Sequence, residues 1–172
     1  MICQSYLKLI EIRLNGYNIM LNVGDKAPFF SLYDSDLNKI TSNDLKGKNY
    51  VLFFYPKDDT PGCTIESNEF SDLYTEFDNE NTEIFGVSLD SSESHRQFRD
   101  KFKIKATLLA DIDGALSKSY EVLKSQELLL KNTMKINRST FIIDSNEIVR
   151  FISHNVSPVG HAREILAIVK NL

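Results

Sequence analysis

The sequence predicts an α/β domain in which a central mixed β-sheet is flanked by helices. Two runs of β-forming residues, 50–55 and 82–89, have the apolar character of strands that are buried on both faces. Segments with helical spacing follow both runs. Two further apolar runs, 139–144 and 148–152, flank a short polar turn, which indicates an antiparallel hairpin. A βαβ half followed by a hairpin gives a sheet of mixed strand direction.

An N-terminal β-hairpin is expected to open this domain, which should extend from residue 21 to residue 172. Residues 30–32 alternate between apolar and polar, and a second short strand is expected near Lys39 and Ile40, after a polar turn. Residues 44–48 should form a turn before the first buried strand.

The first 20 residues are expected to be an extension of the domain. The segment either is a poorly ordered addition or reflects an upstream start, with Met20 as the true initiator. A targeting peptide is the third possibility, although Lys8, Glu11 and Arg13 interrupt any signal-peptide core and no small-residue cleavage site is present.

The remaining elements follow from apolar spacing and from helix caps. A helix should begin near Cys63, because apolar side chains recur at helical intervals at Phe70, Leu73, Tyr74 and Phe77. Ser91 or Ser92, with Glu93, should cap the next helix, which carries Phe98 and Phe102 on one face. A short strand at 108–111, a short helix at 114–122, an irregular segment at 124–137 and a final helix at 160–172 complete an order typical of thioredoxin-like architecture.

Length and charge exclude several classes of protein. The 172 residues suit one domain with a sizeable core. The net charge of −4 provides no basic surface for nucleic acid, and the longest apolar runs are far shorter than the roughly 20 residues that span a membrane. The two cysteines, Cys3 and Cys63, form no disulfide framework, so a reducing, cytoplasmic location is expected.

Cys63 lies in a strand–turn–helix segment that favours reactivity. The turn carries Pro56 and Pro61, which stiffen it, and it places the cysteine in the first turn of the predicted helix. The unpaired N–H groups and the partial positive charge at a helix N-terminus favour a thiolate, which is the nucleophilic form. The hydroxyl of Thr60 can turn towards the sulfur. The alternative is an inert cysteine buried in apolar surroundings.

The segment 54–64, Phe-Tyr-Pro-Lys-Asp-Asp-Thr-Pro-Gly-Cys-Thr, resembles the peroxiredoxins, whose signature is Pro-x-x-x-Thr-x-x-Cys. It is most similar to the bacterioferritin-comigratory-protein (PrxQ) subfamily of these AhpC/TSA-type proteins. Residues 24–30, Gly-Asp-Lys-Ala-Pro-Phe-Phe, also resemble the start of such domains, and the resemblance extends over residues 21–172. It implies a thiol-dependent peroxidase that reduces hydrogen peroxide and organic hydroperoxides without a cofactor or a metal, as a monomer or a weak homodimer.

The resemblance also implies roles for individual residues. Cys63 would attack the peroxide, and Arg138, at the entry to the predicted C-terminal hairpin, would stabilise the thiolate and polarise the peroxide. The hydroxyl of Thr60 and the backbone N–H groups of Gly62 and Cys63 would orient the two oxygens. Pro56 would keep water and backbone donors away from the sulfur. Without the resemblance, Arg138 would be interpreted as a solvated arginine at a strand edge.

The chain departs from the subfamily at the resolving cysteine. Many members carry a second cysteine five residues after the first, where this chain has Asn68, and no cysteine follows Cys63. A one-cysteine peroxiredoxin is therefore expected, with thioredoxin, or glutathione with glutaredoxin, as the electron donor. Cys3 could also act as the resolving thiol. A redox sensor or holdase without turnover, and a cysteine hydrolase, are the alternative functions.

Other polar residues give no pattern for a second site. His95, His154 and His161 show no spacing that relates them to Cys63, and they form no zinc motif with the two cysteines. Asp58 and Asp59 lie next to each other in a turn, where carboxylates are usually solvated. Asp111 and Asp113 flank another turn and are expected to be structural.

Overall fold

The computed structural model of the chain describes residues 20–128 and 131–172. Residues 1–19, which make up nearly all of the expected extension, lie outside the described residues. The division into an extension, 1–20, and a domain, 21–172, therefore stays a prediction. In the described part, no helix is long and apolar enough to cross a membrane.

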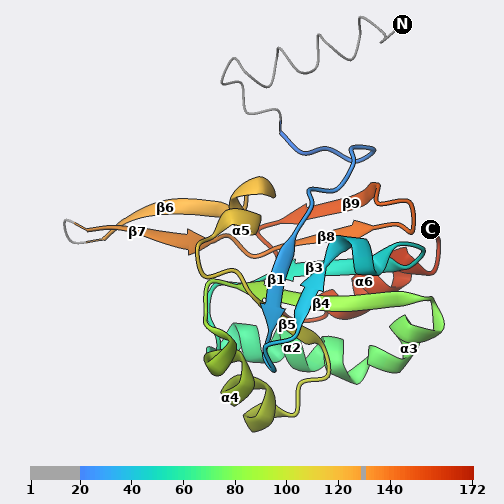
Figure 1. Cartoon of the computed structure of the whole chain (residues 1–172). Coiled ribbons are helices and arrows are strands. Elements are labelled where there is room, and N and C mark those ends of the chain that lie inside the picture. The colour runs from blue at the N-terminus through green and yellow to red at the C-terminus, as the bar shows by residue number, and fades with distance from the viewer. Residues whose placement is uncertain (1–19, 129–130) are drawn as a thin grey trace, which may run out of the picture.

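A seven-stranded mixed sheet forms the centre of the molecule (Figure 1). Its strand order is β2-β1-β5-β4-β3-β8-β9. Strands β3, β4 and β5 are parallel, and the hairpins β1–β2 and β8–β9 pair with them antiparallel. The strands are β1 (Ser31–Asp34), β2 (Lys39–Thr41), β3 (Asn49–Phe54), β4 (Thr82–Ser88), β5 (Thr107–Ala110), β8 (Ser139–Ile143) and β9 (Val149–His154). The predicted mixed sheet and both hairpins are confirmed.

Helices cover both faces of this sheet. They are α2 (Pro61–Asp72), α3 (Tyr74–Asn79), α4 (Ser92–Phe102), α5 (Ala115–Ser119) and α6 (His161–Val169), with a 3-10 turn, η1, at Ser42–Leu45. Alternate residues of β3 point to opposite faces. Phe53 packs in a core with Phe70 of α2 and Ile165 of α6, whereas Phe54 packs with Leu116 of α5 on the other side. Strand β3 is therefore buried on both faces, as its sequence predicts.

The ends of α4 follow from local chemistry. The hydroxyl of Ser91 accepts a hydrogen bond from the backbone N–H of Ser94 at 3.2 Å, so Ser91 rather than Ser92 is the N-cap. At the other end Lys103 adopts a left-handed conformation, with φ 57°, and its N–H donates to the carbonyl of Arg99. This is a common way to end a helix.

Three expected segments differ in detail from the structure. The helix after Cys63 is two helices, because Leu73, with φ −94° and ψ 6°, ends α2 and α3 begins at the next residue. The helix expected over 114–122 is limited to α5, because the chain leaves helical geometry at Glu121, with φ 58°. The turn expected at 44–48 begins earlier, with η1.

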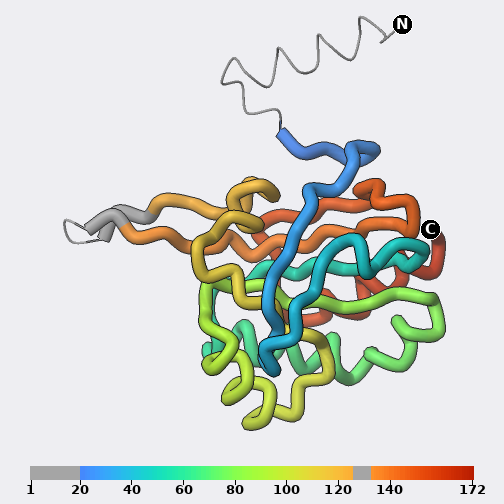
Figure 2. Tube along the Cα trace, viewed as in Figure 1, coloured from blue at the N-terminus to red at the C-terminus, as the bar shows by residue number. Residues whose placement is uncertain are grey.

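The expectation of an irregular segment at 124–137 was wrong. Strands β6 (Leu123–Leu128) and β7 (Lys131–Ile136) form an antiparallel two-stranded ribbon, separate from the main sheet. Figure 2 shows the ribbon extending from one side of the body. Its base is anchored, since Ile136 is buried, but Lys124 and Lys135 further out are exposed. Since the described side chains at 124, 125 and 133–135 are exposed, these positions lack the alternation of apolar and polar residues by which strands are predicted.

Candidate functional site

Cys63 lies in the first turn of α2, directly after the loop that leaves β3. Thr60 is the N-cap of this helix, and Pro61 is its first residue, where the missing N–H is not needed. The Cys63 side chain is buried, with 1% of its surface exposed. Among the described residues, the backbone N–H groups of Gly62 and Cys63 have no hydrogen-bond partner, as expected in the first turn of a helix.

Arg138 extends from the chain between β7 and β8 to the sulfur. Its Nη2 donates to Sγ of Cys63 at 3.2 Å, and its Nη1 donates to Oε2 of Glu66. The backbone around the arginine is fixed, because the N–H of Val156 donates to the Arg138 carbonyl at 3.1 Å and the N–H of Asn137 donates to the Val122 carbonyl at 2.8 Å. The structure thus brings together the two residues that lie 75 positions apart in the sequence.

Glu66 is a site residue that the sequence interpretation missed. Its side chain is fully buried, and its second oxygen, Oε1, has no hydrogen-bond partner in the described part of the chain. Burial raises the pKa of Glu66 to about 7, although the neighbouring Arg138 acts to lower it. Glu66 follows Cys63 by three residues, so both side chains lie on one face of α2. This spacing of three residues is the sequence feature from which Glu66 could have been predicted as a site residue.

The guanidinium of Arg138 therefore faces two acidic groups, the Cys63 thiol and the Glu66 carboxyl. Burial acts to lower the pKa of Arg138, but the negative charges of Glu66 and Cys63 outweigh it and raise that pKa above its usual value. The arginine is a permanent cation, and 13% of its side chain is exposed. It can stabilise a thiolate and hold an oxygen atom that gains negative charge.

The other predicted site residues surround this group. The hydroxyl of Thr60 donates to the carbonyl of Lys57 at 3.1 Å, so in this structure it is directed to its own loop. A Cβ atom added to Gly62 would lie 3.2 Å from Nη2 of Arg138, so the absence of a side chain at Gly62 leaves room for the guanidinium. Pro56 is half-buried and lies with Arg138 at a cavity.

This cavity has a volume of about 310 Å³ and lies between the active-site loop, residues 55–60 between β3 and α2, and the base of the ribbon. It is lined by Pro56, Lys124, Lys135, Ile136, Asn137 and Arg138. The lining is positively charged. It contains the long side chains of Lys124 and Lys135, which occupy paired positions in the ribbon, and the guanidinium of Arg138. The cavity is open enough to admit a small molecule beside the guanidinium.

The expectation that Asp58 is solvated was wrong. Its side chain is 5% exposed and accepts hydrogen bonds from Tyr55, Ser94 and His95, of which the last two come from α4. Asp59 is exposed, as expected for a turn. Asp58 and His95 are far apart in the sequence, and only the packing of α4 against the loop brings them together.

Two further expectations concern residues outside this group. Asp111 is structural, as expected, since its carboxylate accepts from the backbone N–H groups of Leu116 and Ser117 and so holds the start of α5. Cys3 lies outside the described residues, so its part in the chemistry stays a prediction. Within residues 20–128 and 131–172, no three His, Cys, Asp or Glu side chains form a group that could hold a metal ion.

Comparison with known proteins identifies the family of the chain. The model of the AhpC/TSA family matches residues 23–152. The chain belongs to this family. Among its curated relatives, a Helicobacter pylori protein named putative peroxiredoxin bcp is 41% identical over 146 residues, which are 85% of this chain and 96% of that protein.

Solved structures of similar AhpC/TSA proteins share the fold. A mutant of PrxQ from Xylella fastidiosa has a TM-score of 0.83 and 34% identity, and the match covers 88% of this chain and 96% of that one. The bacterioferritin comigratory protein of Xanthomonas campestris, whose structure was described for its alkyl peroxide reduction, has a TM-score of 0.78 and 36% identity over 83% and 90% of the two chains. The predicted thioredoxin-like fold and the resemblance to the Bcp/PrxQ peroxiredoxins are confirmed.

Proposed function

We propose that the chain is a thiol-dependent peroxidase that reduces hydrogen peroxide and organic hydroperoxides at Cys63. One observation carries this proposal: the guanidinium of Arg138 lies 3.2 Å from a sulfur in the first turn of a helix. The names of the relatives, peroxiredoxin bcp and PrxQ, support it. The expected absence of a metal or prosthetic group is part of the proposal, because the sulfur itself supplies the two electrons.

In the first step the Cys63 thiolate attacks one peroxide oxygen. The S–O bond forms as the O–O bond breaks, and the departing oxygen takes a proton to become water or an alcohol. Cys63 is oxidised to a sulfenic acid. Arg138 stabilises the thiolate and the charge on the departing oxygen, and the free N–H groups of Gly62 and Cys63 lie where they can donate to the peroxide.

Pro56 and Thr60 have supporting roles in this proposal. Pro56 borders the cavity next to Arg138 and brings no N–H group to it, so it limits the donors that compete for the sulfur. The hydroxyl of Thr60 now donates to Lys57, and we propose that it turns to the peroxide when substrate binds. Its position at the N-cap of α2, three residues before the sulfur, supports this role.

In the second step an external thiol reduces the sulfenic acid. The donor thiol displaces water and forms a mixed disulfide with Cys63, and a second donor thiol releases the cysteine as the donor becomes a disulfide. We propose a one-cysteine cycle, because Asn68 occupies the position of the resolving cysteine and no cysteine follows Cys63. Thioredoxin, or glutathione with glutaredoxin, serves as the donor, and the cytoplasm is the proposed location.

Peroxide consumption with each donor system tests the proposal. The wild-type chain should consume many equivalents of peroxide with thioredoxin or with glutathione and glutaredoxin. The Cys63→Ser variant should consume none, since a hydroxyl is a far weaker nucleophile at neutral pH. Consumption of about one peroxide per chain in the presence of every donor would instead identify the redox sensor. Substantial turnover by the Cys63→Ser variant would refute the role of this sulfur.

A further inference from the structure

A buried acid–base pair that the proposed reaction does not use lies beside the active-site loop. The side chains of Asp58 and His95 are 5% and 0% exposed, and His95 Nδ1 lies 2.9 Å from Asp58 Oδ2. Burial of a charged pair costs desolvation that mutual attraction often fails to offset, so apolar side chains could give an equally stable core here. Asp58 and His95 are therefore expected to have a role other than stabilising the fold.

Both nitrogens of the His95 imidazole ring have hydrogen-bond partners. Nε2 lies 3.1 Å from the backbone carbonyl of Leu109, which can only accept. Nδ1 faces both carboxylate oxygens of Asp58 and, at 3.3 Å, the hydroxyl oxygen of Tyr55. That hydroxyl donates its own hydrogen to Asp58 at 2.7 Å. Both ring nitrogens of His95 are therefore engaged, Nε2 by the sheet and Nδ1 by the loop.

Asp58 accepts further hydrogen bonds besides the one that it shares with His95. Its Oδ2 also accepts from the hydroxyl of Ser94 at 2.7 Å. Burial acts to raise the pKa of Asp58, but the hydrogen bonds from His95, Tyr55 and Ser94 outweigh it and hold that pKa below its usual value. Burial also raises the pKa of Tyr55 well above its ordinary value, so its phenol keeps the hydrogen that it donates.

Asp58 is the point at which the active-site loop is attached to the body of the protein. It lies in the segment 55–60, which joins β3 to α2, and its own N–H donates to Oδ2 of Asp90 at 2.8 Å. Through His95 the loop is joined to α4 and, at Leu109, to β5 of the central sheet. A continuous set of buried contacts thus runs from the sheet to the loop that precedes Cys63.

We propose that Asp58 and His95 are positioning residues that hold the loop, and with it Cys63, in the geometry that meets Arg138. This inference rests on the proposed peroxidase function. The pair acts through the loop backbone, since neither residue forms a hydrogen bond with Cys63 or Arg138 in the described part of the chain. The same attachment is not expected to favour recycling, because Cys63 is 1% exposed and a looser loop would make its sulfur more accessible to a donor thiol.

The two half-reactions test this proposal, because the attachment should affect them differently. In His95→Gln and Asp58→Asn, formation of the Cys63 sulfenic acid by hydrogen peroxide should slow by roughly 10- to 100-fold, the cost of a small misplacement of a reacting group. Reduction of the preformed sulfenic acid by dithiothreitol should proceed at the wild-type rate or faster. Peptide mass spectrometry assigns both reactions to Cys63.

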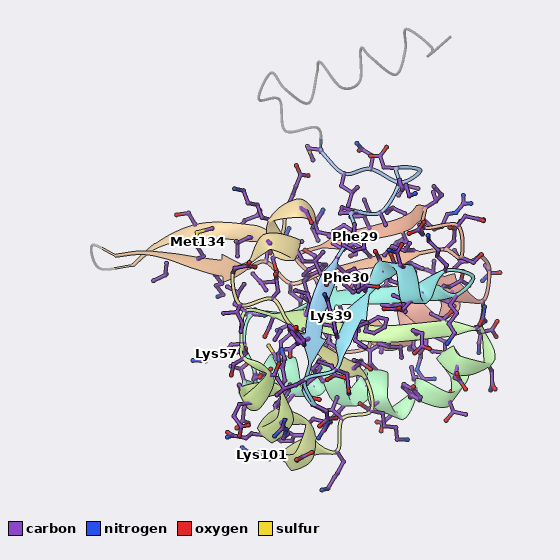
Figure 3. All side chains as sticks on the ribbon, in the orientation of Figure 1. Phe29, Phe30, Lys39, Lys57, Lys101 and Met134 are labelled. Carbon is purple, nitrogen blue, oxygen red and sulfur yellow. The ribbon has the colours of Figure 1, made fainter. Side chains whose placement is uncertain are left out.

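A second contact between α4 and the loop provides a matched control. Nζ of Lys101 lies 2.7 Å from Oδ2 of Asp59, and both side chains are exposed. Figure 3 shows Lys101 at the outer edge of the molecule. Lys101→Gln should leave both rates unchanged, since an exposed ion pair contributes little. If His95→Gln behaves like Lys101→Gln, or slows both half-reactions equally, the positioning role is refuted.

Two further measurements keep the proposal testable if His95→Gln and Asp58→Asn fold poorly. Tyr55→Phe retains the aromatic ring and removes one donor to Asp58, so it should slow only the peroxide step, by a smaller factor. In the wild-type chain, NMR should show a ring N–H of His95 that exchanges slowly with solvent, and rapid exchange would overturn the inference that the ring holds the loop. If the wild type consumes no peroxide, the proposed function fails, whereas the histidine spectrum and the alkylation rate of Cys63 still test the attachment.

Discussion

Replacement of Glu66 by glutamine removes a fully buried carboxyl group that shares Arg138 with the reactive sulfur. In the folded chain the pKa of Glu66 is raised from 4.5 to about 7 by burial. The folded state therefore favours the protonated form. Stability from this group is fully present below pH 4.5 and is lost as the pH rises through 7. Glutamine has the shape of the protonated form at every pH.

The size of the effect follows from the difference between the two pKa values. Each pKa unit corresponds to about 1.4 kcal/mol, so ionised Glu66 destabilises the fold by about 3 kcal/mol relative to its protonated form. The free energy of unfolding of Glu66→Gln, minus that of the wild type, should thus increase by about 3 kcal/mol between pH 4.5 and pH 8. Titrations of all other groups largely cancel in this difference.

Urea unfolding at a series of pH values measures this difference. Glu76→Gln serves as the control, because Glu76 is an exposed carboxylate that pairs with Lys170 on the surface, and its replacement should change stability little at any pH. A Glu66→Gln difference that does not vary with pH would refute the argument from burial. In the same variant, alkylation of Cys63 should begin at lower pH, because one anion no longer competes for Arg138.

Three further substitutions test the surroundings of the sulfur. Arg138→Met should move the onset of Cys63 alkylation to higher pH, by roughly 1–3 units, and an unchanged profile would separate the arginine from the sulfur. Gly62→Ala should slow the peroxide step without a comparable loss in the urea midpoint, because its Cβ would lie 3.2 Å from Arg138 Nη2; wild-type kinetics would show that the guanidinium adapts. Asn68→Cys should form a disulfide with Cys63 after peroxide treatment and resist sulfinic acid formation, as followed by mass spectrometry. Since five residues of helix span about 7.5 Å, this bond requires the start of α2 to unwind. Equal resistance in the parent would indicate that another thiol resolves Cys63.

The parts of the fold and site that could be predicted are those with local signals. Strand β3 is a continuous apolar run, and Cys63 follows it in a turn with two prolines, so neighbouring residues are sufficient to place them. Arg138 was placed by resemblance, because a single arginine at a strand end carries no signal of its own. Glu66 could have been found, since its spacing from Cys63 puts it on the same helix face.

The remaining parts depend on contacts between distant residues. Asp58 resembles a solvated turn residue until α4 places His95 over it, 37 positions later in the sequence. The ribbon β6–β7 was missed for another reason. Its strands pair with each other, and the described side chains at 124, 125 and 133–135 are exposed, so those positions were not constrained to an alternating pattern.

The ribbon leads directly into the arginine of the site. Strand β7 ends at Ile136, and Arg138 follows just before β8, whose residues are all buried. The charge that faces Cys63 thus stands at the boundary between a weakly packed segment and a tightly packed one. Substitutions at exposed ribbon positions such as Met134 and Lys135 remove few buried contacts and should be nearly silent in unfolding experiments. A shift of the ribbon base would nevertheless displace Arg138. Mutational scans scored by stability and by turnover should therefore disagree most along this ribbon.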